Sequence, residues 1–293
     1  MEFFKYHALG NDMVIIDPAK FTLPLSTASI RLICNRNFGL GADGICYGPL
    51  NQTPLKMHFF NPDGSESFKS GNGLRIFARY LWDYGYVKTE DFIIQIADES
   101  IQVKINDTYG HTITTSMGRL SFLSRDIPMK GFNREVIKEK VTIEDCNHII
   151  TAVTIGNPHC VIFSDDNDVI NKARQLGPII EIASLFPQRT NVQFVNVIDP
   201  HTIKIGIWER GAGYTLASGS SASAAAGAAI KTGRCISPVT VHMPGGTALV
   251  NITPKWDVRL SGSVEAVGMG QFASDFINKL HQTNISSNEN VTL

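Results

Sequence analysis

The stretch MHFFNPDGSESFKSGNGLRIFARYL at residues 57–81 has a counterpart later in the chain, KIGIWERGAGYTLASGSSASAAAGAA at residues 204–229. In each, a strand-like run ends in a polar residue, and a Ser-Gly pair follows nine positions later at the start of a helix-like segment. The two serines, Ser70 and Ser218, stand half a chain length apart. Because self-similarity over a whole domain indicates duplicated halves, we expect one hydroxyl from each half in a shared site.

The duplication extends upstream of both serines. Gly10-Asn11 precedes one apolar run and Gly156-Asn157 precedes another, each at nearly the same distance before its serine. Matched order and spacing make a chance similarity a poor explanation. The sequence therefore predicts two pseudo-symmetric halves and not a solenoid of short repeats.

Length and composition indicate an ordinary soluble globular protein. The chain has 293 residues, which favours two domains, and its 43% hydrophobic and 18% charged residues suffice for a sizeable core. A net charge of -1 without a basic stripe argues against nucleic acid as an obligate partner. The longest apolar runs have the length of strands, so no membrane span is expected.

The N-terminal segment and the cysteines indicate a cytoplasmic protein. MEFFKYHALGND at residues 1–12 lacks the basic and apolar regions of a signal peptide. The five cysteines are an odd number without a CxxC pair, a pattern that indicates neither a disulfide framework nor a zinc site. We therefore expect reduced thiols, no metal and a cytoplasmic location.

Most segments have the pattern of strands, with short apolar or alternating runs between Gly, Pro, Asn and Asp. They are FIIQIA (92–97), IQVKI (101–105), TITTSM (112–117), NVQFVNVI (191–198), TIKIGIW (202–208) and VTVHM (239–243). Helical spacing predicts a central helix over residues 73–83, and a run of small residues predicts a tightly buried one over 222–231. The predicted fold class is α+β, with a curved, mostly antiparallel sheet around one helix in each domain. The polar segment 281–293 is expected to be disordered.

The position of each Ser-Gly pair indicates an anion site. Backbone N–H groups at a helix start are unpaired and the helix dipole is positive there, so a carboxylate binds well. Two such ends on one carboxylate would place Ser70 and Ser218 on opposite faces of the attached carbon. That arrangement suits inversion, because one group removes a proton while the other delivers one from the opposite face. Taken singly, each serine is better explained as an N-cap or turn residue, and the duplication reverses this preference.

Seven segments, in order over nearly the whole chain, resemble diaminopimelate epimerase. They are FFKYHALGNDMVIID, CNRNFGLGADGICYG, FFNPDGSESFKSGNGLRIFARYL, TIGNPHCVIF, RTNVQFVNV, WERGAGYTLASGSS and MPGGTALV. The resemblance implies an amino-acid epimerase or racemase of lysine biosynthesis that uses neither pyridoxal phosphate nor any other cofactor. Its substrate would be diaminopimelate, converted from the LL to the meso form by two-base proton transfer between the domains, or a related amino acid.

The resemblance also implies an organisation of the chain. One pseudo-symmetric domain would comprise residues 1–117 and 262–280, because the last strand returns to it, and the other would comprise 118–261. Residues 281–293 would form a polar tail. The protein would be a homodimer that binds a small amino acid.

The resemblance implies roles for individual residues. Ser70 and Ser218 match the catalytic pair, and Glu209 and His159 match residues that assist it. The residues that match contacts to the substrate are Asn11, Asn61, Asn157, Asn191 and Arg210. Among these, Asn61, Asn191 and Arg210 would hold the distal carboxylate. The backbone positions that would grip the α-carboxylate are Gly71, Asn72, Gly219 and Ser220.

Some of these assignments have simpler readings. Asn11 and Asn157 each follow a glycine and fit ordinary turn positions. His159 fits a hydrogen-bonded core histidine. For Arg210, bidentate binding of a carboxylate is more natural than a solvated ion pair with its neighbour Glu209.

The chain departs from the family at the catalytic pair, which in the family is two cysteines. A thiol pKa near 8.5 can be tuned to working pH, whereas a serine hydroxyl is a far weaker acid that needs an adjacent base. The serines belong either to an engineered variant made to trap ligand or to a natural subfamily. Ser223, another serine where the family commonly has cysteine, favours the second, as do Tyr214, where many relatives carry Glu, and Lys69 beside Ser70.

Three functions remain in view. The leading one is a cofactor-independent epimerase, with diaminopimelate as the first substrate. The second is an isomerase of another small carboxylate that uses Glu209 or His159 as its base. The third is a catalytically silent protein that binds an amino acid.

Overall fold

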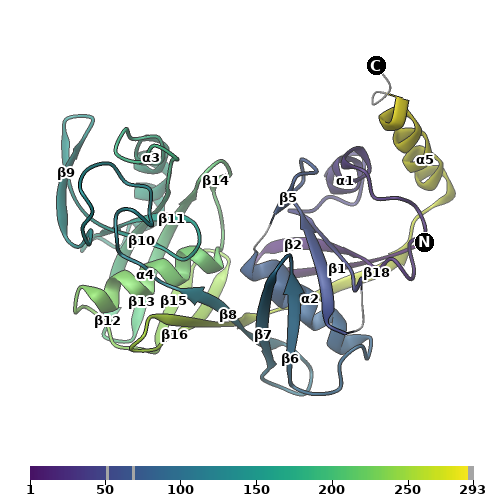
Figure 1. Cartoon of the computed structure of the whole chain (residues 1–293), viewed down its shortest axis with the longest axis horizontal. Helices are drawn as coiled ribbons and strands as arrows, with labels where there is room; N and C mark the ends of the chain where they lie inside the picture. Colours follow the sequence, from purple (N-terminus) through teal and green to yellow (C-terminus); the bar gives the residue numbers. More distant parts are fainter. Residues whose placement is uncertain (51–52, 68–69, 290–293) are drawn as a thin grey trace. The chain divides into compact units, whose positions relative to one another are not determined.

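The computed structural model describes residues 1–50, 53–67 and 70–289 of the chain. The chain divides into two compact units (Figure 1): unit 1 is Met1–Ile113 with Ser263–Leu293, and unit 2 is Thr114–Gly262. In the part of the chain that is described, no helix is both long and apolar enough to cross a membrane.

Unit 1 is built on a mixed sheet. Its strands are β1 (Glu2–Ala8), β2 (Asn11–Ile16), β3 (Ile45–Tyr47), β4 (Leu55–Phe60), β5 (Glu66–Ser67), β6 (Asp91–Ile96), β7 (Glu99–Ile105) and β18 (Glu265–Gln271). They pair in the order β18-β1-β2-β3-β4-β6-β7, and β5 pairs with the end of β4. Neighbours are antiparallel except β2 with β3 and β4 with β6, which are parallel.

Unit 2 has a sheet of the same kind. Its strands are β8 (Thr112–Arg119), β9 (Glu139–Ile143), β10 (Cys146–Thr154), β11 (Pro158–Phe163), β12 (Asn191–Asp199), β13 (Thr202–Glu209), β14 (Gly213–Tyr214), β15 (Val239–Met243), β16 (Gly246–Ile252) and β17 (Asp257–Ser263). They pair in the order β9-β10-β11-β12-β13-β15-β16-β17-β8, with β14 against the end of β13. The parallel pairs are β11 with β12 and β13 with β15.

The two sheets have the same pairing pattern, which confirms the pseudo-symmetric halves. The run from β1 to β7 and the run from β10 to β16 share antiparallel, parallel, antiparallel, parallel and antiparallel steps in that order. All six predicted strands are present, as β6, β7, β8, β12, β13 and β15. The α+β prediction with mostly antiparallel sheets is therefore confirmed.

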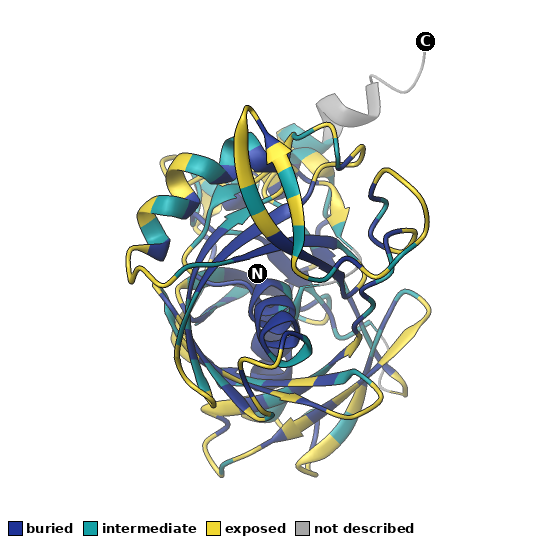
Figure 2. Cartoon of the chain, turned by 90° about the vertical axis from the view of Figure 1, so that its left-hand side faces the viewer, coloured by how far each residue is buried: buried dark blue, intermediate teal, exposed yellow. Residues whose placement is uncertain are grey.

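A buried helix packs on each sheet. In unit 1, α2 (Gly71–Asp83) packs on β1, β2 and β7, and in unit 2, α4 (Gly219–Lys231) packs on the strands from β10 to β16. Figure 2 shows α4 dark blue over most of its length within the ring of strands. Its alanines at positions 222, 224, 225, 226, 228 and 229 are fully buried. The tight burial predicted from the small residues is thus observed, and both helices begin earlier than predicted because Ser70 and Ser218 cap them.

Two further helices lie outside the sequence prediction. Helix α1 (Thr27–Cys34) is short, and α3 (Val169–Glu181) contains a Gly-Pro pair at Gly177-Pro178 that has the pattern of a turn. Gly177 is needed there because a Cβ atom would come within 2.5 Å of the Trp208 side chain. The close packing of α3 on β13 therefore requires a glycine at position 177, although a Gly-Pro pair is typical of a loop.

The prediction of a disordered tail is wrong for most of its length. Helix α5 (Ser274–Glu289) covers all of the segment 281–293 except residues 290–293, which lie outside the described residues. The Asn284 side chain contributes to this order, because it accepts a hydrogen bond from Ser29 Oγ at 2.7 Å and donates one to the Pro24 carbonyl at 3.0 Å. Helix α5 also docks by apolar burial, because Leu280 is fully buried and Phe276 and Ile277 pack against the same apolar cluster as α1.

Gly206 on β13 gives a test of this packing. A Cβ atom there would lie 2.1 Å from the Val169 carbonyl oxygen at the start of α3, and a backbone atom cannot rotate away. We expect Gly206→Ala to lower the free energy of unfolding by about 1–3 kcal/mol, measured by urea denaturation. Gly268→Ala is the matched control, because no atom lies within 4 Å of its added Cβ. Equal midpoints for the two variants would contradict the packing.

Candidate active site

Both predicted catalytic serines cap a buried helix. Ser70 Oγ accepts a hydrogen bond from the Gly73 N–H at 3.0 Å, and Ser218 Oγ accepts one from the Ser221 N–H at 3.4 Å. Their backbones match, with φ/ψ of -135°/112° at Ser70 and -145°/124° at Ser218. A hydroxyl that accepts a hydrogen bond keeps its own proton for donation. The capping role is therefore compatible with proton transfer.

The first residues after each cap carry the N–H groups predicted to hold a carboxylate. These residues are Gly71 and Asn72 in α2, and Gly219 and Ser220 in α4. The N–H groups of a first helical turn have no carbonyl partner within the helix, and they lie at the positive end of its dipole. Each unit thus presents a helix N-terminus with the chemistry of an anion site.

Glu209 lies beside Ser218. It ends β13, and its burial raises the pKa of its carboxyl group, while the nearby Ser218 and Thr215 hydroxyls lower it by a smaller amount. The Ser218 hydroxyl also lies 3.3 Å from Ser220 Oγ. A carboxylate with a raised pKa is a stronger base, so unit 2 pairs its serine with a group able to take a proton.

The corresponding position in unit 1 is different. Asn61 directly follows β4, and its Nδ2 donates to Ser65 Oγ at 3.0 Å. Among the described residues, Ser70 Oγ makes no hydrogen bond with a carboxylate or histidine. The two serines are therefore equivalent in position but not in chemical surroundings.

His159 lies in the core of unit 2 and reaches Ser218 through other side chains. It is fully buried, and its Nε2 lies 2.9 Å from Asn157 Oδ1. Asn157 Nδ2 lies 3.5 Å from Ser220 Oγ, which in turn contacts Ser218. Burial lowers the pKa of His159 to about 3, which outweighs the opposing effect of the Gln193 side chain. A neutral imidazole therefore stands at the end of a hydrogen-bond chain from the serine.

Asn191 and Arg210 are joined at the end of β13. Asn191 is buried at the start of β12, where its Nδ2 donates to the Pro158 carbonyl at 2.8 Å and its Oδ1 accepts from the Arg210 N–H at 2.9 Å. The Arg210 guanidinium is exposed and donates to the Gln188 carbonyl at 3.0 Å. It forms no ion pair with the described residues, so its charge is available to a carboxylate.

Asn11 is held by charged residues that sequence reasoning missed. Its Nδ2 donates to Asp43 Oδ2 at 3.1 Å, and Arg36 Nη2 lies 2.7 Å from carboxylate oxygens of both Asp12 and Asp43. Lys5 forms an ion pair with Asp12. Burial opposes ionisation of Asp12, but hydrogen bonds from Arg36 and Lys5 lower its pKa to about 2. Asp43 thus fixes the Asn11 amide so that its oxygen points away from the carboxylates.

The departures from the family have identifiable surroundings. Tyr214 in β14 lies beneath the Arg174 guanidinium, 4.1 Å from the ring centre. Ser223 Oγ donates to the Gly219 carbonyl at 2.8 Å within α4. Lys69 lies outside the described residues.

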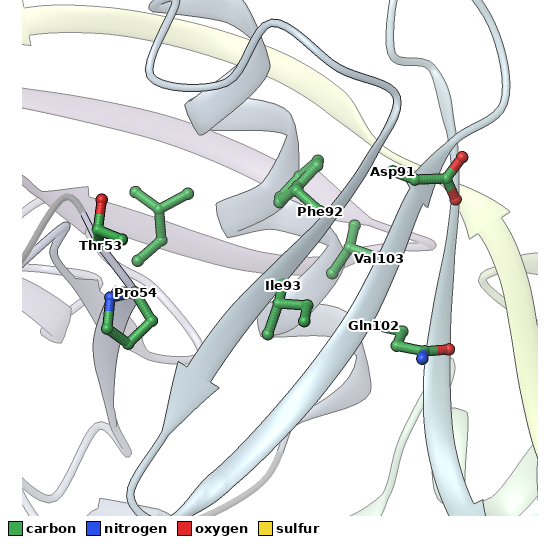
Figure 3. A pocket seen from close by; sticks show the side chains of 8 residues that line it. Thr53, Pro54, Asp91, Phe92, Ile93, Gln102 and Val103 are labelled. Carbon is green, nitrogen blue, oxygen red and sulfur yellow. The ribbon is translucent and has the colours of Figure 1, made fainter.

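One pocket lies away from these residues. A pocket in unit 1 is lined by Thr53, Pro54, Leu55, Asp91, Phe92, Ile93, Gln102 and Val103 (Figure 3), none of which is a predicted site residue. Within the described ranges, no group of three or more His, Cys, Asp or Glu side chains is placed to hold a metal ion.

Comparison with known proteins shows the family of this chain. A family model described as diaminopimelate epimerase matches residues 3–123 and 151–270. The chain belongs to the diaminopimelate epimerase family. Diaminopimelate epimerase 2 of Nostoc sp. is 51% identical over 94% of this chain and 96% of its own length. Diaminopimelate epimerase of Desulfitobacterium hafniense is 37% identical over 94% of this chain and 99% of its own.

Solved structures show the same fold as this family member. A hydroxyproline epimerase from Agrobacterium vitis, with bound trans-4-hydroxy-L-proline, has a TM-score of 0.65 at 12% identity. The likeness covers 93% of this chain and 90% of that protein.

The buried His159 gives a pH test. Below about pH 6.5 the imidazole takes a proton in the unfolded chain but stays neutral in the folded one, so the free energy of unfolding falls as the pH drops toward 3. Between pH 7 and pH 5 this accounts for roughly 2 kcal/mol, which His159→Gln should remove. Denaturant unfolding at both pH values measures the difference. Between pH 7.5 and 8.5 the two proteins should show the same pH dependence, and equal slopes below pH 6.5 would contradict a neutral His159.

Proposed function

We propose that this chain is a cofactor-independent epimerase that inverts the α-carbon of an amino acid, with diaminopimelate, LL to meso, as the leading substrate. The observation that carries the proposal is the pair of serine-capped helix starts, one per unit, at the positions to which the sequence resemblance gives the acid–base roles. The named relatives at 51% and 37% identity support the choice of substrate.

In the proposed reaction, the helix starts hold the α-carboxylate by their unpaired N–H groups. Negative charge that develops on this carboxylate as the α-proton leaves is stabilised by the same N–H groups. Such stabilisation is provided by backbone atoms alone, and it therefore does not depend on whether the capping residue is serine or cysteine.

Proton transfer in the proposal is directional. On one face, Ser218 takes the α-proton as its own proton passes to the Glu209 carboxylate, for which burial raises the pKa. On the opposite face, Ser70 delivers a proton to the carbon. The substrate thus loses one proton and gains one, and the enzyme resets when Glu209 releases its proton and Ser70 regains one. His159 supports Ser218 through Asn157 and Ser220 without changing charge.

Selection of the distal group rests on Arg210. Its exposed guanidinium lacks a carboxylate partner among the described residues, and Asn191 fixes its backbone. An arginine held in this way suits a second carboxylate on the substrate, as diaminopimelate has. Asn61 and Asn11 are the further polar contacts of the proposal.

Two alternatives differ from this proposal in chemistry. The first is an isomerase of another small carboxylate with Glu209 or His159 as base. The second is an amino-acid-binding protein without turnover. The absence of a described base at the Ser70 hydroxyl is compatible with both alternatives, because neither requires Ser70 to transfer a proton.

Exchange in D₂O separates these functions. The protein is incubated with diaminopimelate and a panel of amino acids, and loss of the α-proton signal is followed by NMR. Exchange with inversion supports the proposal. Saturable binding without exchange supports the silent binding protein, and absence of binding by every amino acid overturns the leading idea.

Introducing thiols tests whether Ser70 and Ser218 occupy the two acid–base positions. We expect Ser70→Cys with Ser218→Cys to raise the rate of α-proton exchange by roughly 100-fold or more, because a thiol is the better acid and base. Either single variant should gain much less, since inversion needs both faces. A double variant that binds diaminopimelate but exchanges no faster than wild type would contradict the assignment.

Removal of the carboxylate tests the Ser218 face. Glu209→Gln keeps the size of the side chain and should lower any exchange by roughly 100-fold or more. Glu135→Gln, on an exposed residue paired with Lys231, is the control and should keep the wild-type rate. Unchanged exchange in Glu209→Gln would exclude this residue as the base.

We also propose that the protein is a cytoplasmic homodimer. The free state of all five cysteines, including exposed Cys146, fits a reducing compartment. The exposed fractions of Val267 and Met269 on β18, 60% and 68%, fit a surface that a second copy covers. Sedimentation velocity measures the oligomeric state, and a monomer at micromolar concentration would contradict the dimer.

A further inference from the structure

Arg75 on α2 is a buried cation without a carboxylate partner. Its side chain is fully buried, and no described residue forms an ion pair with it. Arg79, one turn further along the same helix, has the usual arrangement, with its Nε 2.7 Å from Asp83 Oδ1. Burial lowers the pKa of Arg75 to about 10, which still leaves it charged at neutral pH. An uncompensated buried charge costs several kcal/mol and calls for an explanation.

The charge points toward the start of α2. Arg75 Nη2 donates to Asn72 Oδ1 at 2.6 Å, and Nη1 donates to the Gly71 carbonyl at 3.2 Å. Its Nε has no hydrogen-bond partner. A helix start is already positive, so a cation there is unfavourable for the folded protein on its own. The arrangement becomes favourable when an anion lies at the same helix start.

The equivalent position in unit 2 shows that the backbone contact alone does not require a cation. Ser223 stands five residues after Ser218, as Arg75 stands five residues after Ser70. Its hydroxyl donates to the Gly219 carbonyl at 2.8 Å, the same contact that Arg75 makes with Gly71. A neutral side chain thus performs the packing role, and the positive charge of Arg75 is an additional property of unit 1.

We infer that Arg75 is a positioning residue that makes the α2 helix start selective for the α-carboxylate of the amino acid. Arg75 holds the Asn72 side chain and the Gly71 carbonyl, and so orients the backbone N–H groups of these two residues in one direction. Its positive charge also strengthens binding of the anion. The inference rests on the proposed function of this helix start. With Arg75 in this role, the two halves of the site carry opposite charges: a cation near Ser70 and the Glu209 carboxylate near Ser218.

The charge of the ligand provides the test, by a measurement that does not need turnover. L-2-Aminopimelate has one α-carboxylate and a distal carboxylate, and its 1-carboxamide differs only by loss of the α-charge. Isothermal calorimetry gives the Kd of each ligand for wild type, Arg75→Met, Arg75→Gln and Arg75→Lys. Arg79→Met is the matched control, because it removes an arginine of the same helix whose charge Asp83 already balances.

We expect wild type to bind the acid at least about tenfold more tightly than the amide, a ratio typical of one charge-assisted contact. Arg75→Met and Arg75→Gln should weaken the acid about tenfold and leave the amide nearly unchanged, whereas Arg75→Lys retains most of the preference. Arg79→Met should lower thermal stability but keep the wild-type ratio.

Two results would overturn the inference in different ways. Equal weakening of acid and amide by Arg75→Met and Arg75→Gln would show a merely structural role and leave the proposed function standing. Failure of wild type to bind 2-aminopimelate at all, together with no α-proton exchange on diaminopimelate, would remove the proposed function and this inference with it.

Discussion

The hydrogen bond from a backbone N–H to a serine hydroxyl fixes the start of the buried helix in each unit. This single contact sets where α2 and α4 begin, and hence which N–H groups remain unpaired. Those free groups lie at the end of a helix whose body is enclosed by strands. A shift of one residue in the cap would rotate every one of them by about 100° around the helix axis. The geometry of the site is thus set by the cap and by the packing that holds the helix in place.

The duplicated architecture carries unequal chemistry. Position for position, Glu209 corresponds to Asn61 and Ser223 to Arg75, so an acid and a neutral hydroxyl in unit 2 stand where unit 1 has an amide and a cation. Epimerisation of LL-diaminopimelate to the meso form needs no symmetry in the groups that remove and return a proton. It needs one group that holds a proton weakly and another that releases one readily. Serine, with its weak acidity, makes the help of neighbouring residues more important than it would be for a thiol.

Much of the fold was predictable from the sequence, because its strands are short apolar runs or runs of alternating apolar and polar residues. The two central helices were predictable because one has large apolar residues at helical spacing and the other consists of small residues. The site serines were found because they are duplicated. The missing parts have physical reasons. Helix α3 contains a Gly-Pro pair whose glycine is required by packing against Trp208. Helix α5 is held by contacts that are distant in sequence, namely burial of Leu280 and the hydrogen bond between Asn284 and Ser29. Arg75 could not be predicted as a site residue, because a sequence does not show that a buried cation lacks a carboxylate partner among the described residues. Asp43 could not be predicted either, because its contact with Asn11 joins residues that are distant in sequence.

The return of β18 to β1 has a consequence for how the chain is made. Unit 1 is assembled from both ends of the sequence, and its sheet is incomplete until β18 has left the ribosome. Unit 2 is one continuous segment whose strands are all synthesised before that point. Since domains fold as units during synthesis, unit 2 is able to fold first while β1 waits with an unpaired edge. The last-made strand therefore controls when the first-made half, with Ser70 and Arg75, becomes complete.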